Sequence, residues 1–142
     1  MPRSPAPPLS RVLETALYAD DLARSRAFYG ETLGLTVLLD MPRIVALDVG
    51  GASILLLFQR GATSEPLATA GGIVPPHGAS GEQHLAFAVS AESLDRWRVH
   101  LADAGVPIES EVTWSRGGTS IYIRDPDGHS VEFAAPGVWA TY

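Results

Sequence analysis

The strongest constraint on this chain is an internal repeat of one arrangement of strands and helix. A strand, a helix and three further strands are predicted within residues 12–58, and the same order returns within residues 84–134. Since a duplicated unit fixes the architecture, the sequence predicts an α+β fold. Its two βαβββ modules are expected to be related by a pseudo-twofold axis.

Matching residues support the repeat. Two pairs of segments correspond: residues 14–17 with 84–87, and residues 51–55 with 128–132. Glu14 and His84 then occupy equivalent places in the two modules. Leu55 and Glu132 form the second equivalent pair.

The predicted elements are short and are separated by glycine, proline and aspartate. The first module has strands at 12–19, 35–39, 44–49 and 53–58 and a helix at 22–33; the second has strands at 84–89, 108–114, 120–124 and 130–134 and a helix at 91–104. Asp20 and Asp21 are N-cap candidates, and Gly34 and Gly105 are expected to end the two helices. Between the modules, residues 59–83 are rich in glycine and proline, and we expect no regular structure there.

Length and composition indicate one folded domain. A chain of 142 residues with 46% hydrophobic and 18% charged residues is large enough for a sizeable core. We expect a flexible, proline-rich tail at 1–10 and a single domain at 11–142. Within that domain, module one covers about 11–59, a connecting arm about 60–82, and module two about 83–136.

Charge and cysteine content exclude several classes of partner. A formal net charge of −6 argues against nucleic acid and anionic membranes. Without cysteine there is neither a disulfide framework nor a thiol nucleophile. No apolar run approaches the roughly 20 residues that span a bilayer, and the first residues lack the apolar stretch of a signal peptide. We therefore expect a cytoplasmic protein.

A metal site is predicted where the equivalent positions meet. Glu132 interrupts the apolar pattern of its strand, directly after the turn at residues 125–128, and a buried carboxylate needs a partner. If the four inward positions converge, they bring together Glu14, His84, Glu132 and Leu55. Two carboxylates without a cation would repel each other, whereas one imidazole and two carboxylates suit Mn²⁺, Ni²⁺, Zn²⁺, Fe²⁺ or Mg²⁺. Taken singly, each residue is more typical of a solvated surface, but the repeated placement favours a site.

The chain resembles the vicinal oxygen chelate superfamily, which includes glyoxalase I, extradiol dioxygenases, fosfomycin-resistance enzymes and bleomycin-resistance proteins. The segments that carry the resemblance are residues 19–22, 27–29, 33–35, 84–87 and 122–132, and it extends over nearly all of 12–136. It implies a curved, open, mixed sheet around one divalent metal ion. It also implies a homodimer with shared sites, in which Glu14 meets His84 and Glu132 of the partner subunit.

The chain departs from the family pattern at two places. Many members have histidine where this chain has Glu14, and iron oxygenases usually need two histidines and one carboxylate. Leu55 stands where glyoxalase I has a fourth protein ligand. The resemblance therefore implies a three-ligand site with open positions for substrate oxygens.

Five further residues are candidates for substrate binding or catalysis. Tyr122 could donate a hydrogen bond to an oxygen at the metal, or form a cross-strand aromatic pair. Arg116 could hold an anionic group, or be a solvated loop charge. Ser120 could contribute its hydroxyl, and Trp114 is either core or pocket wall. His77 is either a lid residue near the metal or a surface histidine.

Three functions remain open from the sequence. The first is a metal-dependent enzyme of lyase, isomerase or epoxide-opening type that acts on a small oxygen-chelating molecule, with Glu14 or Glu132 exchanging between ligand and general base. The second is a metal-free protein that sequesters a drug or metabolite. The third is an extradiol-type iron dioxygenase, which Glu14 disfavours.

Overall fold

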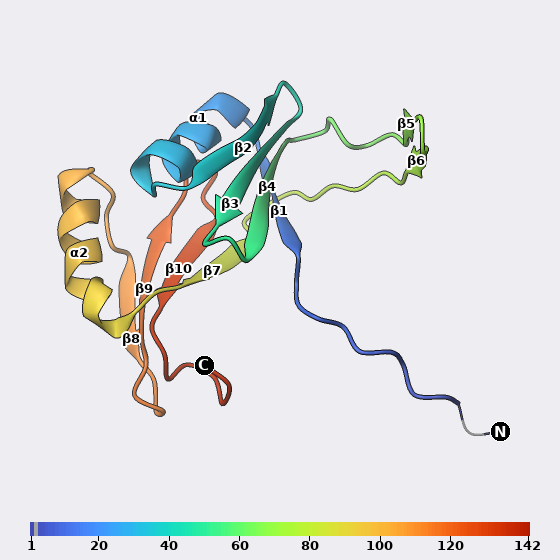
Figure 1. Ribbon diagram of the computed structural model, residues 1–142. Helices are drawn as coiled ribbons and strands as arrows, with labels where there is room; N and C mark the ends of the chain where they lie inside the picture. Colours follow the sequence, from blue (N-terminus) through green and yellow to red (C-terminus); the bar gives the residue numbers. More distant parts are fainter. Residues whose placement is uncertain (2) are drawn as a thin grey trace.

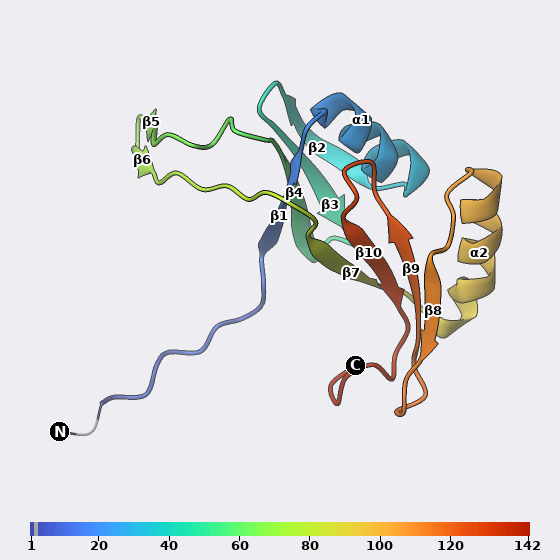
Figure 2. The ribbon, with the colours of Figure 1, turned by 180° about the vertical axis from the view of Figure 1, so that it is seen from behind.

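The computed structural model describes residues 1 and 3–142 and contains two four-stranded sheets of the same topology (Figures 1 and 2). Pro2, which belongs to the predicted tail, lies outside the described residues. The first module is built from β1 (Glu14–Ala19), α1 (Leu22–Ala27), β2 (Thr36–Met41), β3 (Ile44–Val49) and β4 (Ser53–Gln59). The second is built from β7 (His84–Ala88), α2 (Leu94–Asp103), β8 (Ser110–Thr113), β9 (Thr119–Arg124) and β10 (Ser130–Ala134).

Strand order repeats between the two sheets. The orders are β1-β4-β3-β2 and β7-β10-β9-β8, so β1 and β7 lie at equivalent edges. Strands β1 and β7 are each parallel to their neighbour, and the remaining pairs in both sheets are antiparallel. The predicted α+β fold and its repeat are therefore confirmed.

Alternation along the strands places the core between the sheets and the helices. One face of each strand carries buried apolar side chains, among them Leu47, Leu55 and Leu57 in the first module and Ile121 and Val131 in the second. The residues between them point to the opposite side of each sheet. We call this side the open face; Glu14, His84 and Glu132 project from it.

The first helix is shorter than predicted. Asp21 caps it as expected, its carboxylate accepting a hydrogen bond from the Arg24 backbone nitrogen at 3.1 Å. After α1 the chain continues as a π-helical turn, Phe28–Thr32, instead of a regular helix to residue 33. Tyr29, in this turn, is fully buried. A 3₁₀ turn, Ala91–Ser93, likewise precedes α2.

The arm contains regular structure, which the sequence prediction had excluded. Strands β5 (Leu67–Thr69) and β6 (Gly72–Val74) pair as a short antiparallel hairpin. Thr69 stabilises its turn, because its Oγ1 donates to the Gly72 carbonyl oxygen at 2.7 Å and accepts from the Gly71 backbone nitrogen at 3.2 Å. The glycines therefore form a turn rather than prevent pairing. Figure 1 shows the arm reaching away from the two sheets.

The predicted turn at residues 125–128 joins the two modules. Tyr29 donates from its hydroxyl to Asp125 Oδ2 at 2.7 Å, within the buried core. His129 Nε2 lies 2.8 Å from the Tyr18 carbonyl oxygen, and His129 Nδ1 accepts from the Gln83 backbone nitrogen at 2.9 Å. These bonds explain why Asp125 and His129 are buried although they are polar, and they give His129 a structural role.

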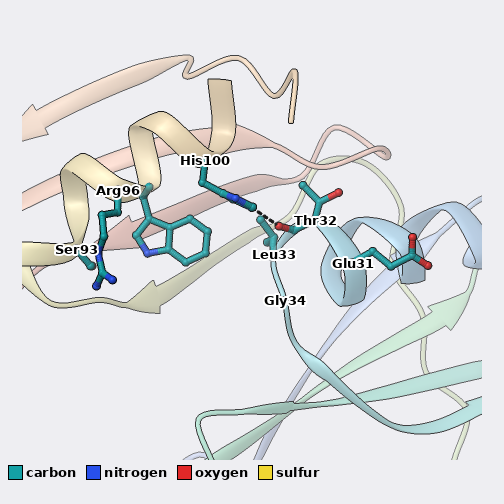
Figure 3. A pocket seen from close by; sticks show the side chains of 8 residues that line it. Glu31, Thr32, Leu33, Gly34, Ser93, Arg96 and His100 are labelled. Carbon is teal, nitrogen blue, oxygen red and sulfur yellow. Dashed lines mark hydrogen bonds between the residues drawn. The ribbon is translucent and has the colours of Figure 1, made fainter. Parts of the chain in front are cut away.

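A second seam joins the modules on the helical side. His100, on α2, donates from Nε2 to the Thr32 carbonyl oxygen at 2.7 Å. Figure 3 shows this bond at a shallow hollow of about 360 Å³, with Arg96 and Glu31 on opposite sides of it. The hollow lies away from the open faces.

Across the described residues, no helix combines the length and apolar character needed to span a membrane.

Candidate functional site

A chain of hydrogen bonds crosses the open face of the second sheet. Trp114 donates from Nε1 to Ser120 Oγ at 2.8 Å, and Ser120 donates to Glu132 Oε1 at 2.5 Å. The other carboxylate oxygen, Oε2, lies 3.2 Å from His84 Nε2. Glu132 is only 6% exposed although it is charged. The structure therefore brings together four residues that the sequence proposed for the site.

His84 is oriented as a metal-binding histidine would be. Its Nδ1 lies 3.0 Å from the Ser130 carbonyl oxygen, which can only accept, so Nδ1 carries the proton and donates. Nε2 then presents a lone pair to Glu132 Oε2, which is also an acceptor. Two acceptor atoms at 3.2 Å repel each other unless a proton or a metal ion lies between them.

Tyr122 lies beside this pair. Its ring stacks near that of His84, with centroids 6.3 Å apart and planes 28° from parallel. Burial, followed by the charge of Glu132 and a hydrogen bond to it, raises the pKa of the Tyr122 hydroxyl. The Tyr122 hydroxyl therefore lies next to the carboxylate of the His84–Glu132 pair.

Glu14 and His77 belong to a different part of the molecule. They line an open pocket of about 790 Å³ on the open face of the first sheet, which we call the cup. The remaining wall of the cup is contributed by three regions: β1 and β4 (Thr15, Ala16, Leu56, Phe58), the β2–β3 hairpin (Met41, Pro42, Arg43, Ile44) and the arm (Thr63, Glu65, Leu67, Val74, Pro75).

Within one chain the three predicted ligands do not converge. Among the described residues, the only group of three metal-ligating side chains whose donor atoms lie within 4.8 Å of one another is Asp125, Asp127 and His129. The expectation that Glu14 meets His84 and Glu132 through the internal pseudo-twofold axis is therefore wrong for a single chain.

In the group of Asp125, Asp127 and His129, most polar atoms are already used by the protein, and only Asp127 Oδ2 is buried without a hydrogen-bond partner. Both His129 nitrogens are used in backbone contacts. Asp125 Oδ1 accepts from the Asp127 and His129 backbone nitrogens, each at 2.9 Å, and its Oδ2 accepts from a tyrosine hydroxyl. Because no imidazole lone pair is left over, this group serves the turn rather than a cation.

The strand register corrects the equivalence assigned to Glu132. Glu14 pairs with Ile54 and His84 pairs with Ser130, so the position equivalent to Glu132 is two residues beyond Ile54. That residue is Leu56, which lines the cup. Leu55 points into the core and is 1% exposed. The sequence alignment was one residue out of register, and a shift of one residue moves a side chain to the other face.

Arg116 and two aromatic residues complete the inventory. Arg116 is exposed in the β8–β9 loop, and no hydrogen bond or ion pair of its side chain is found within the described residues. Phe58 and Tyr18, which the sequence did not propose for the site, stack at 5.8 Å, and Phe58 also contacts His77 edge-on at 4.7 Å. The period-two alternation of β1 and β4 could have identified these two residues as open-face residues.

Comparison with known proteins identifies relatives over almost the whole chain. A family model described as the Glyoxalase/Bleomycin resistance protein/Dioxygenase superfamily matches residues 11–133. Glutathione transferase FosA of Serratia marcescens is 32% identical over 119 residues, which cover 82% of this chain and 74% of that protein.

Solved structures show the same fold. The crystal structure of lactoylglutathione lyase from Agrobacterium tumefaciens has a TM-score of 0.85 and 38% identity, and the match covers 94% of this chain and 99% of that one. A glyoxalase/dioxygenase from Nostoc punctiforme has a TM-score of 0.65 and 26% identity, covering 93% and 98% of the two chains.

Proposed function

Because this chain belongs to the glyoxalase/bleomycin resistance protein/dioxygenase superfamily, we propose that it is a divalent-metal-dependent enzyme acting on a small, oxygen-chelating molecule. The relatives named glutathione transferase FosA and lactoylglutathione lyase are enzymes by name. They favour chemistry of the lyase or fosfomycin-modifying kind for this chain.

The observation that carries the proposal is the pairing of His84 and Glu132. Two acceptor atoms face each other at 3.2 Å, and each residue is held from behind, His84 by the Ser130 carbonyl and Glu132 by the Ser120 hydroxyl. Metal-binding histidines typically donate their second N–H in this way. Mn²⁺, Ni²⁺, Zn²⁺, Fe²⁺ and Mg²⁺ all accept such a donor set, and the residues do not separate them.

The third ligand in this proposal comes from a second copy of the chain. Glu14 is exposed and apart from the His84–Glu132 pair, while β1 and β7 lie at the edges of their sheets. A twofold dimer that sets the first module of one subunit against the second module of the other would bring Glu14 to the pair, at two equivalent sites. The donor set then becomes one imidazole and two carboxylates.

The remaining residues have roles that follow from their positions. When bound, the metal ion would polarise a substrate oxygen as a Lewis acid and leave coordination positions open. Tyr122, whose ring lies beside that of His84, donates a hydrogen bond to a substrate oxygen at the metal. Glu14, the more exposed of the two carboxylates, is the candidate general base. Arg116 is available to hold an anionic group of the substrate.

Metal titration of complementary variants tests both parts of the proposal. Chelator-treated protein should bind Mn²⁺ in a calorimetric titration, and Glu132→Ala should lower the affinity by more than the roughly 10- to 100-fold lost with an outer hydrogen-bond partner. Glu14→Ala should also weaken binding.

A mixture of the two variants separates a shared site from a single-chain site. Random exchange of subunits between Glu14→Ala and Glu132→Ala should restore about a quarter of the sites, because each mixed dimer contains one complete set. Restoration of no sites would contradict the shared arrangement. Wild-type protein that binds none of the five metals would contradict metal dependence itself.

A metal-free binding protein is the second candidate, and the cup is the observation that favours it. A pocket of about 790 Å³ with mostly apolar walls could hold a drug-sized molecule without any cation. In that case a proton on His84 would supply the positive charge beside Glu132. Metal analysis of the purified protein, with each metal offered in turn, separates the two functions.

A further inference from the structure

The cup has the size and lining of a site for an apolar molecule. Its volume of about 790 Å³ falls within the roughly 300–1,000 Å³ of small-molecule pockets. Ala16, Leu56 and Phe58 form its floor, and Leu67 and Val74 of the arm form one side. None of these side chains can pair with a charged group.

Charge around the cup disfavours an anion. The acidic groups that line it are Glu14 and Glu65, and the basic ones are Arg43 and His77. Arg43 is partly engaged, because its Nη2 donates to the Ala62 carbonyl oxygen at 2.8 Å. Without the imidazole, two carboxylates and one guanidinium give the lining a net negative charge. This charge repels anions, as does the net charge of −6 of the whole protein.

One polar group, His77, is held rigidly at the wall. Its backbone is tied to Thr63 in both directions, through His77 N to Thr63 O at 3.0 Å and Thr63 Oγ1 to His77 O at 2.5 Å. Its Nδ1 lies 2.5 Å from the Tyr18 hydroxyl. In the tautomer that carries its proton on Nε2, Nδ1 accepts from the Tyr18 hydroxyl and Nε2 is left as a donor for a ligand.

We propose that the cup binds the uncharged, aromatic body of the substrate, and that His77 donates a hydrogen bond to a polar atom on it. The aromatic surface of Phe58, with Tyr18 stacked behind it and His77 edge-on, provides the stacking partner. This inference rests on the proposed function, because the metal would hold the chelating oxygens of the same molecule. It assigns the part of the substrate inside the cup to an uncharged aromatic group, and not to the two carboxylates of a glutathione conjugate or to a dianionic phosphonate.

Calorimetric binding by the full-length protein in the presence of a chelator tests the proposal without the metal. The probes are neutral 2-naphthol, S-hexylglutathione and methylphosphonate. 2-Naphthol should bind at least about tenfold more tightly than either anionic probe. The reverse order, or no binding of 2-naphthol because partner side chains fill the cup, would overturn the proposal.

Matched variants show whether binding takes place in the cup. Ala16→Phe fills the cup and should reduce 2-naphthol affinity by about tenfold or more. Leu38→Phe introduces the same ring at a residue that is 57% exposed and does not line the cup, so the affinity of this variant should be unchanged. Thermal unfolding and solution mass check that both variants remain folded and keep the same assembly. Equal affinities of the two variants would place the binding elsewhere and refute the inference.

The hydrogen bond from His77 and the effect of the negative charge of the cup are tested separately. His77→Phe keeps a ring but removes the donor, so 2-naphthol affinity should fall by about three- to tenfold while that of 2-methylnaphthalene is retained. Glu65→Lys should strengthen binding of S-hexylglutathione, and Glu92→Lys, outside the cup, should not. These binding measurements contain no metal, so their outcome is independent of the metal titration. Failure of this inference can therefore be told apart from failure of the proposed function.

Discussion

The open faces of the two modules differ although their strands have the same order. The second face carries a series of hydrogen-bonded polar groups from Trp114 through Ser120 to Glu132 and His84, of which Ser120 and Glu132 are buried. The first face is an apolar cup with Glu14 as its acidic residue on β1. At the positions equivalent to His84 and Glu132 the first module has Glu14 and Leu56, so one ligand type has changed and one has been replaced by an apolar residue.

This difference indicates that the two copies of the repeat have different roles in the site. A carboxylate and an imidazole locked by hydrogen bonds are suited to a fixed ion, because little reorganisation is required of them. A broad apolar surface is suited to the body of a ligand. In the proposed dimer the two kinds of face meet. The second module of one subunit then supplies the fixed metal ligands of a site, and the first module of the other supplies the apolar contacts to the substrate.

The largest expected effect is a difference in stability between two variants that place a carboxylate on opposite faces of the first sheet. Leu55→Glu would bury an unpaired charge in the core and should lower the free energy of unfolding by about 3–5 kcal/mol or more. Leu56→Glu, one residue on, points into the cup and should cost at most about 1 kcal/mol. Urea denaturation of the two variants measures the comparison. Equal losses would contradict the register that makes Leu56, and not Leu55, the counterpart of Glu132.

This pair of residues also shows how far the sequence could lead. The repeat, the strands and the family were predicted and are confirmed, because period-two alternation and turn chemistry are local properties of the sequence. The equivalence of Glu132 was missed because matching Gly51, in the β3–β4 turn, with Gly128 is one residue out of step with the strand pairing, which puts Ala52 at the position of Gly128. Register is decided by pairing between strands.

Other differences have the same origin in long-range contacts. The π-helical turn brings no local signal with it, yet Tyr29 within it bonds to Asp125, 96 residues away. Nor could the sequence show that Glu14 lies apart from His84 and Glu132 within one chain, since that depends on how the two sheets sit together. The assignment of ligands and the bounds of the single domain stay predictions.

A smaller effect is expected from loosening the polar chain of the second face. Ser120→Ala removes the donor that fixes Glu132 Oε1, so metal affinity should fall by about 10- to 100-fold, or roughly 1.4–2.7 kcal/mol. Trp114→Phe removes only the donor to Ser120 and should have a lesser effect. Ser110→Ala, on the exposed strand β8, serves as the control. Calorimetric Mn²⁺ titration gives the affinities. If all three variants bind Mn²⁺ as tightly as the wild type does, these hydrogen bonds do not position the Glu132 carboxylate.

A further effect, on stability at high pH, is expected from the bond that joins the two modules, and the composition makes this effect easy to isolate. All ten residues counted as lysine or arginine are arginine, and there is no cysteine, so between about pH 9 and 12 the side chains that titrate are the four tyrosines. Burial, and then the neighbouring charge of Asp125 and the hydrogen bond to it, raise the pKa of Tyr29 far above its ordinary value of 10.

A raised pKa in the folded state means that the contribution of Tyr29 to stability is fully present below pH 10 and is lost as the pH rises above it. The loss approaches about 1.4 kcal/mol for each further pH unit. Tyr29→Phe should be less stable at pH 7, since it leaves Asp125 without its donor, but its stability should fall less steeply between pH 10 and 12. Ultraviolet titration of phenolate and urea denaturation at each pH measure both quantities. Identical slopes for the variant and the wild type would show that Tyr29 ionises normally, and that the first module is held to the second by contacts other than this buried bond.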